Sequence, residues 1–320
     1  MKTSFTKIIT VALALFFLGS YNATASTTTE DVQLFSAPNK DQKITPKSIA
    51  KAFGDTGLSI VGNNNMNTPF SKRFPKLYYK VYNLAMFVNN DLSFKLLKKY
   101  PSFGALTPLT MSIWQDKDGN MNIATLTARG MARVTQIPVN DPDLNAYAAL
   151  VQKALKNAMP KGKFQKTSLN TTDLKKPLQV NFVADIDMDD EDFDLDDYID
   201  DFESEFEGEM EALGFLFPNI TNVQEEIFDE HDYKAYDFYH TYSMCKFDVI
   251  YPVSKLHPAA GAWAPCSFYI YKKKGEKKLH MGFLSVENWI ESLNIKDQES
   301  IKPLKEAEGM IKNILKEITE

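Results

Sequence analysis

Histidine and cysteine are scarce in this sequence. Four histidines and two cysteines occur among 320 residues, so few side chains are available for a multi-histidine metal centre or a disulfide-rich scaffold. The sequence also lacks a glycine-rich phosphate loop, a Gly-x-Ser-x-Gly elbow, a His-Glu-x-x-His motif and a Cys-x-x-Cys-His haem attachment motif. With these signatures missing, the sequence favours a protein that is not an enzyme, and we expect no cofactor.

Long apolar runs are missing as well. The longest run near the N-terminus, Ile8 to Leu18, is shorter than the roughly 20 residues that a membrane-spanning helix needs. It follows Lys2 and Lys7 and precedes the small residues of Ala23-Thr24-Ala25, which is typical of a signal peptide. We therefore expect cleavage near Ala25, a periplasmic or secreted protein and no transmembrane segment in the mature chain. The alternative is an uncleaved N-terminal anchor.

Basic residues are not in excess. Removal of residues 1–25 takes away two lysines and no acid, which leaves 34 basic and 42 acidic side chains and a net charge of −8. This balance disfavours nucleic acid as a partner, because its phosphates attract cationic surfaces. The remaining 295 residues exceed the usual size of a single hydrophobic core, so we expect two domains.

An internal repeat with an offset of 157 residues supports two domains. Glycine widens the range of backbone conformations and proline narrows it. Their recurrence at one offset therefore indicates that the chain follows the same path twice. The recurring pairs are Gly57 and Gly214, Tyr79 and Tyr236, Pro101 and Pro258, Gly104 and Gly261, and Pro108 and Pro265. We predict a first copy at 26–160, a linker at 161–177 and a second copy at 178–320.

The same order of elements is predicted in each copy. Antiparallel strands in meander order, with helices on one face, make an α+β fold. In the first copy we expect strands at 31–35, 58–61, 76–87, 109–114 and 121–127 and helices at 46–55, 92–99 and 144–159. In the second we expect strands at 178–185, 215–220, 233–244, 267–271 and 279–284 and helices at 196–213, 247–255 and 301–318.

The central part of each copy resembles a known family. The stretches 101–119 and 257–266 look like the bacterial domain of unknown function 302, in which a glycine is followed by Leu-Pro at the start of a strand. Thr107 and Ala264 stand where members carry the leucine, and Cys245 matches a cysteine that many members have before the short helix. The resemblance implies a TATA-binding-protein-like α+β fold that is often dimeric and has no established activity or catalytic residues.

Both cysteines, Cys245 and Cys266, fall in the second copy. The equivalent positions of the first copy hold Val88 and Leu109. One cysteine ends a strand and the other begins one, so both can lie at the same end of the sheet. In an oxidising compartment they are candidates for a disulfide. Two free, buried thiols are the alternative that their apolar counterparts suggest.

A thiol-dependent redox site or a soft-metal site is a third interpretation of these cysteines. Thiol, thioether and imidazole groups suit soft metals such as Cu(I), and the candidate ligands are Cys245, Cys266, His240, Met244 and His257. Along a strand, however, His240 and Met244 share one face while Cys245 points to the other. This alternation counts against a common ligand set.

Acidic residues are concentrated at 185–211, with 16 carboxylates in 27 residues. Asp185, Asp187 and Asp189 alternate as in a calcium loop, but Asp190 and Asp196 replace the glycine and glutamate that such a loop requires. Apolar residues recur at helical spacing through the same region, at Leu195, Ile199, Phe202, Phe206 and Leu213. This pattern favours an amphipathic helix with a solvated acidic face.

The two copies differ in charge. Residues 26–160 carry 16 basic and 9 acidic side chains, a net charge of +7, and residues 161–320 carry 18 and 33, a net charge of −15. Opposite charges favour association, so we expect the copies to pack on each other as a pseudo-dimer. Divergence of exposed surfaces after duplication is the alternative explanation.

Two functions follow from these patterns. The first is a non-catalytic binding or interaction protein of the cell envelope, with an unknown small ligand or envelope protein as its partner, held in a groove at the sheet or between the copies. The second is a redox or soft-metal-handling protein that uses Cys245 and Cys266.

Overall fold

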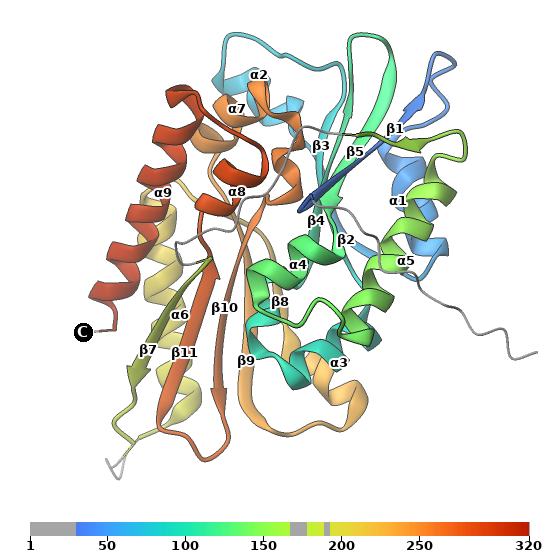
Figure 1. Cartoon of the computed structure of the whole chain (residues 1–320). Coiled ribbons are helices and arrows are strands. Elements are labelled where there is room, and N and C mark those ends of the chain that lie inside the picture. Colours follow the sequence, from blue (N-terminus) through green and yellow to red (C-terminus); the bar gives the residue numbers. More distant parts are fainter. Residues whose placement is uncertain (1–29, 167–177, 189–192, 320) are drawn as a thin grey trace, which may run out of the picture.

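Each copy folds into one antiparallel sheet with helices against it, so the predicted α+β class is confirmed (Figure 1). The structure is a computed structural model, and it describes residues 30–166, 178–188 and 193–319. The predicted signal peptide lies outside the described residues. None of the helices in the described ranges has the length and apolarity that crossing a bilayer demands.

The first sheet has the strand order β2-β3-β4-β5-β1-β6. Its strands are β1 (Val32–Pro38), β2 (Ser59–Asn65), β3 (Tyr82–Val88), β4 (Leu109–Gln115), β5 (Asn120–Leu126) and β6 (Lys163–Phe164). The helices of this copy are α1 (Pro46–Asp55), α2 (Asn67–Arg73), α3 (Asn90–Lys99), α4 (Ala128–Thr135) and α5 (Pro142–Ala158), with a short 3₁₀ turn η1 (Pro101–Leu106).

The second sheet has the corresponding order β8-β9-β10-β11-β7. Its strands are β7 (Gln179–Asp185), β8 (Leu216–Asn222), β9 (Tyr236–Cys245), β10 (Cys266–Lys273) and β11 (Lys278–Leu284). The helices are α6 (Leu195–Ala212), α7 (Phe247–Leu256), α8 (Glu287–Ser292) and α9 (Gln298–Glu317), with short turns η2 (Gln224–Phe228), η3 (Asp229–His231) and η4 (Pro258–Ala262).

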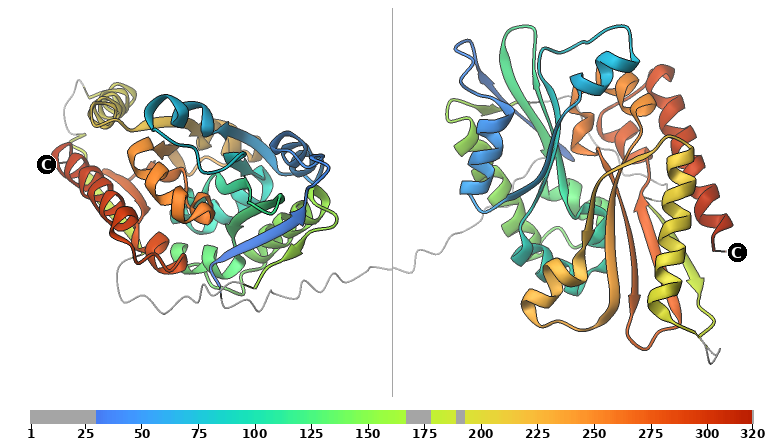
Figure 2. Two further views of the ribbon diagram at one scale, coloured as in Figure 1. Left: turned by 90° about the horizontal axis from the view of Figure 1, so that it is seen from above. Right: turned by 180° about the vertical axis from the view of Figure 1, so that it is seen from behind.

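Local sequence signals set the helix starts. Thr45 caps α1 in a capping box with Ser48, and Asp141 caps α5 by accepting hydrogen bonds from the backbone amides of residues 143 and 144. The acidic helix α6 buries an apolar stripe, as its spacing predicts: Ile199, Phe202, Phe206 and Met210. Figure 2 shows α6 and α9 on one outer side of the molecule and α1 and α5 on the other.

A buried ion pair fixes α4 to the start of β1. The side chain of Asp31 has no exposed surface, and its carboxylate pairs with the guanidinium groups of Arg129, at 3.3 Å, and Arg133. The Thr127 backbone amide also donates to the Asp31 carbonyl at 2.9 Å. Because a buried carboxylate needs a charged partner, these contacts determine where α4 lies.

Each 3₁₀ turn packs against the sheet of the other copy. The first-copy turn η1 contacts β10, and the second-copy turn η4 contacts β4 and β5. The hydroxyl of Tyr239 donates to the carbonyl of Pro101, and the hydroxyl of Tyr82 donates to that of Pro258 at 3.4 Å. The two donors, Tyr82 and Tyr239, are 157 residues apart, and so are the two acceptors, Pro101 and Pro258. Each copy therefore donates this hydrogen bond to the other.

Aromatic stacking between the copies follows the same reciprocal pattern. Phe74 stacks on Tyr251 with ring centroids 3.8 Å apart, and Phe94 stacks on His231 at 3.9 Å. Phe94 corresponds to Tyr251, and Phe74 to His231, at the repeat offset. Residues of both copies, Phe103 and Trp263 among them, contribute to one buried apolar cluster.

Several elements differ from the sequence expectation. The predicted strand 76–87 begins only at Tyr82, and helices α2, α4 and α8 were not predicted. Part of the predicted linker, Lys163–Phe164, is strand β6 and pairs with β1, while residues 167–177 lie outside the described residues. Asp189 and Asp190 of the calcium-loop pattern also lie outside them.

Candidate binding groove between the two copies

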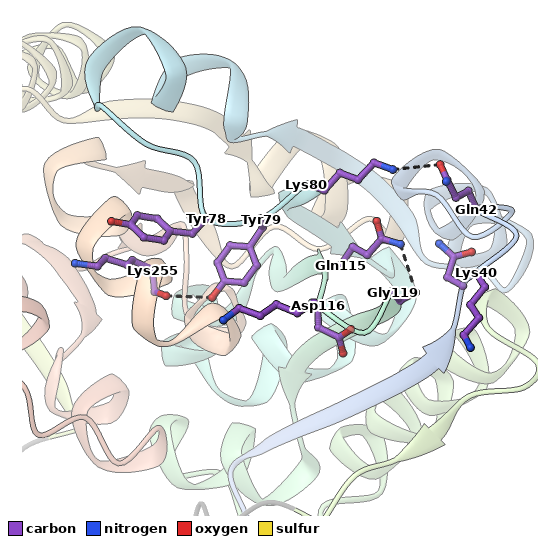
Figure 3. Close-up of a pocket in the computed structure, with 11 residues that line it drawn as sticks. Lys40, Gln42, Tyr78, Tyr79, Lys80, Gln115, Asp116, Gly119 and Lys255 are labelled. Atoms are coloured by element: carbon purple, nitrogen blue, oxygen red, sulfur yellow. Dashed lines mark hydrogen bonds between the residues drawn. The ribbon is translucent and has the colours of Figure 1, made fainter.

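A groove of about 670 Å³ lies where loops of the first copy meet α7 of the second (Figure 3). Its lining comes from four separate segments. These are the β1–α1 loop with Asn39, Lys40 and Gln42, the segment Tyr78, Tyr79 and Lys80 before β3, the β4–β5 hairpin with Gln115, Asp116, Lys117 and Gly119, and Lys255 at the end of α7.

Hydrogen bonds hold the loops of the groove in place. The backbone amide of Asn39 donates to the Gly119 carbonyl at 3.2 Å, which joins the β1–α1 loop to the hairpin. The side chain of Asn39 also exchanges hydrogen bonds with the backbone of Ile44. Gly119 has a φ of +82°, a conformation that favours glycine, so the hairpin turns where the Asp-Gly step predicts.

Tyr79 links the groove to the second copy. Its hydroxyl donates to the Lys255 carbonyl at 3.1 Å, as Figure 3 shows. Burial raises the pKa of Tyr79 to about 12, so the phenol stays protonated at neutral pH and remains a donor. The ammonium of Lys255 pairs with Glu299 at 2.6 Å, outside the groove lining.

The groove is cationic. Four lysines and one aspartate line it, a net charge of +3. Lys40, Lys80 and Lys117 are exposed and make no ion pair with any described residue, and the Lys80 ammonium lies 3.4 Å from the Gln42 side-chain oxygen. The one acid, Asp116, is occupied within its own turn. Burial raises its pKa, but hydrogen bonds from Asn120, Asn122 and the backbone outweigh burial and lower the pKa.

Two groove residues have counterparts in the second copy that pair with each other. Lys80 corresponds to Asp237 and Gln115 to Lys272 at the repeat offset, and the Lys272 ammonium pairs with the Asp237 carboxylate. The Lys272 side chain is only 2% exposed. The counterpart of Lys80 is therefore an acid with an internal ionic partner, whereas Lys80 in the first copy lines the open groove.

Two comparisons with known proteins bear on this architecture. The family described as "Domain of unknown function DUF302" matches residues 37–161 and again 192–318, which is most of the chain. The chain belongs to the DUF302 family. Tandem copies of the DUF302 domain, expected from the 157-residue repeat, are thus confirmed.

A solved DUF302 structure is similar to part of the chain. The structure titled "Crystal structure of uncharacterized conserved protein DUF302 from Bacillus stearothermophilus" is 13% identical, covers 45% of this chain and 98% of its own, and has a TM-score of 0.35. No curated protein matches the chain.

In this DUF302 protein the two thiols lie near each other but are unbonded. Cys245 is buried and Cys266 is half-buried, and both line one apolar cavity at the end of the second sheet. Burial raises the pKa of each thiol to about 12. Redox chemistry and metal binding need the thiolate, so these raised pKa values disfavour both for the two thiols in this setting. The disulfide stays a prediction.

The two histidines among the other metal-ligand candidates bond to acids elsewhere. His240 bonds Glu203 at 2.7 Å and His257 bonds Asp297 at 2.8 Å, while Met244 lines the apolar cavity beside the thiols. Within the described part of the chain, no three His, Cys, Asp or Glu side chains form a group that could hold a metal ion. The groove lysines escaped sequence reasoning because they come from four segments, none of which carries a ligand-binding motif.

Proposed function

We propose that this DUF302 protein is a non-catalytic binding protein that holds a small anionic ligand in the groove between its two copies. The observation that carries the proposal is that Lys40, Lys80 and Lys117 line one open cavity and have no ionic partner among the residues that the structure describes. Converging cations of this kind suit carboxylate, phosphate or sulfonate groups. Tyr79 and Tyr78 add aromatic surface to the same cavity.

We further propose that the two copies act as one intramolecular pseudo-dimer. The reciprocal tyrosine hydrogen bonds and the reciprocal aromatic stacks support this arrangement. The groove depends on it, because Lys255 reaches the groove from the second copy and its carbonyl receives the Tyr79 hydroxyl. The ligand is therefore expected to bind only when both copies are docked.

Replacing two groove lysines should weaken anion binding. In the double variant Lys80→Ala and Lys117→Ala, we expect the affinity for the trisulfonated dye pyranine, measured by fluorescence anisotropy at low salt, to fall about tenfold. An exposed lysine–anion contact contributes up to about 1 kcal/mol, so two contacts of about 0.7 kcal/mol each reach the 1.4 kcal/mol that corresponds to a factor of ten. Pyrophosphate should displace the dye from the unmodified protein.

The matched control removes the same charge elsewhere. Lys153 and Lys156 are exposed on α5 and make no ion pair with any described residue. The double variant Lys153→Ala and Lys156→Ala should bind the dye as the unmodified protein does. Equal weakening by both double variants would mean that only net charge attracts the dye, and the groove proposal would then be wrong.

We also propose that the protein is exported to the periplasm or secreted after cleavage of residues 1–25. The expected result is that intact-mass spectrometry of the exported protein, without reduction, gives the mass of the chain from Ser26 onward. A mass lower by two hydrogen atoms would establish the predicted Cys245–Cys266 disulfide, and the thiol mass would exclude it. A chain that keeps residues 1–25 and sediments with membranes would overturn the location.

A further inference from the structure

A second open cavity lies beside the groove, at the end of the edge strand β2. Its volume is about 460 Å³, and its walls come from the start of α1, the end of β2 and the start of β3. Lys80 lines both this cavity and the groove, so the two spaces adjoin. The polar side chains of the wall are those of Thr45, Lys47, Asn63, Asn65, Lys80 and Asn83. Because side-chain amides are the commonest of these, we name this space the amide cavity.

Hydrogen bonds hold the amides of this cavity in place. Asn63 and Asn65 lie on one face of β2, because side chains alternate along a strand, and Asn83 of β3 pairs with Asn65 in the ladder. The Asn83 amino group donates to the Asn63 side-chain oxygen at 2.9 Å, and the Asn63 amino group donates to the Pro46 carbonyl at 2.9 Å. The Asn83 side-chain oxygen and the Asn65 amino group have no partner among the described residues, so the cavity offers a free acceptor and a free donor.

Asn67 joins the amide cavity to the segment that carries Lys80. Its backbone amide donates to the Asn65 side-chain oxygen at 3.1 Å, which orients the free amino group of Asn65. Its own side chain donates to the carbonyls of Tyr79 at 3.0 Å and Lys80 at 3.2 Å. The Lys80 ammonium lies beside the Gln42 side chain in the groove, as Figure 3 shows. A ligand held by that ammonium can therefore extend to the amides.

A longer helix contacts the corresponding part of the second sheet. Helix α6 has 18 residues and α1 has 10, and the two end at nearly the same place relative to the repeat, so α6 begins earlier. His240, the counterpart of Asn83, bonds Glu203 of α6 at 2.7 Å. Phe202, which precedes Glu203, is 6% exposed. In the first copy α1 does not reach this part of the sheet, and the amides there line an open space.

We propose that the ligand of the groove is an anionic saccharide, whose acidic group binds at the groove lysines and whose hydroxyls bind in the amide cavity. This inference rests on the proposed function, because it places the acidic group in the groove. A sugar hydroxyl both donates and accepts hydrogen bonds, so neighbouring hydroxyls match the free Asn65 amino group and the free Asn83 oxygen. None of the described residues that line the amide cavity is acidic. The volumes of both spaces, about 670 and 460 Å³, suit a ligand of this size.

The test compares glucuronate with cyclohexanecarboxylate, which has a ring of the same size and a carboxylate but no hydroxyl. Each competes with pyranine for the full-length protein at neutral pH and constant ionic strength. Both carry a single negative charge, so Lys47 and Lys80 attract them equally. Because one neutral hydrogen bond changes affinity by up to about tenfold, glucuronate should displace the dye at a concentration about tenfold lower.

Two independent variants should reduce this preference to about threefold or less. Asn65→Ala deletes the free amino group, and Ala50→Leu adds bulk to the wall of the amide cavity. The controls make the same chemical changes elsewhere. Asn64→Ala alters the next residue of β2, which faces the other side of the sheet and lines neither space, and Ala149→Leu alters the exposed side of α5. Both controls should keep the tenfold preference.

The outcomes separate this inference from the proposed function. If the groove lysines are needed for dye binding but the two carboxylates compete equally, the groove binds anions and the saccharide inference is wrong. The inference also fails if Asn65→Ala and Ala50→Leu, both shown to be folded by near-ultraviolet circular dichroism, keep the tenfold preference. Dye binding that does not depend on the groove lysines would overturn the proposed function and this inference together.

Discussion

Alanine at Gly104 or at Gly261 should destabilise the protein by about 1–3 kcal/mol each, the usual cost of overpacking a tight contact. A Cβ at Gly104 would lie 2.1 Å from the Tyr239 hydroxyl oxygen and 2.8 Å from the Tyr269 Cβ. One at Gly261 would lie 2.5 Å from the Ser112 Cβ and 2.9 Å from the Ser112 Cα. These neighbours belong to the opposite copy and, apart from the hydroxyl, cannot rotate away.

Denaturant unfolding of the two variants measures this cost. Gly208→Ala and Gly309→Ala are the controls, because they lie within α6 and α9 and an added Cβ meets nothing within 4 Å. Since alanine favours a helix over glycine by about 1 kcal/mol, the control variants should be more stable than the unmodified protein. Unchanged stability in Gly104→Ala and Gly261→Ala would show that the copies do not dock through η1 and η4.

Replacing Asp31 by asparagine should cost about 3–5 kcal/mol, because removal of one partner leaves a buried charge uncompensated. The Asp31 side chain has no exposed surface and Arg133 is 12% exposed, so solvent cannot replace the lost carboxylate. The change keeps the shape of the side chain, which confines the effect to charge. Unfolding by denaturant again gives the free energy.

A surface pair provides the contrast. Lys51 and Asp55 form an ion pair with side chains 75% and 62% exposed, and such a pair contributes at most about 1 kcal/mol. Asp55→Asn should therefore change the free energy of unfolding by less than 1 kcal/mol or so. Equal costs for Asp31→Asn and Asp55→Asn would show that the Asp31 carboxylate is not buried with its arginines.

Elements with a local signal were predictable from the sequence, and α2 shows why others were not. Helix α1 begins at Pro46 as predicted, and α5 begins at Pro142, two residues before its predicted start. Helix α2 is short and buries Phe70. The centroid of the Phe70 ring lies 5.2 Å from that of Tyr251 and 6.2 Å from that of Phe247, both in the other copy. Its apolar residues are buried by a distant part of the chain, so local periodicity could not assign them.

The candidate groove was less accessible to sequence reasoning than the fold. The sequence indicated a seam between two copies as a place for a ligand, but not which residues lie there. Lys40, Lys80 and Lys117 are surface lysines in loops, with no spacing that distinguishes them from Lys153 or Lys156. These lysines come together only because the β1–α1 loop, the segment before β3 and the β4–β5 hairpin all lie near α7.

The ion pair between Lys272 and Asp237 has a consequence for stoichiometry. Two identical subunits related by a twofold axis would present two equal grooves, and ligand at one could influence the other. In a single chain the two positions can differ, and here the counterparts of Lys80 and Gln115 form an ion pair with each other. If the proposed ligand binds in this groove alone, it should titrate with one equivalent per chain along a simple hyperbola, without cooperativity.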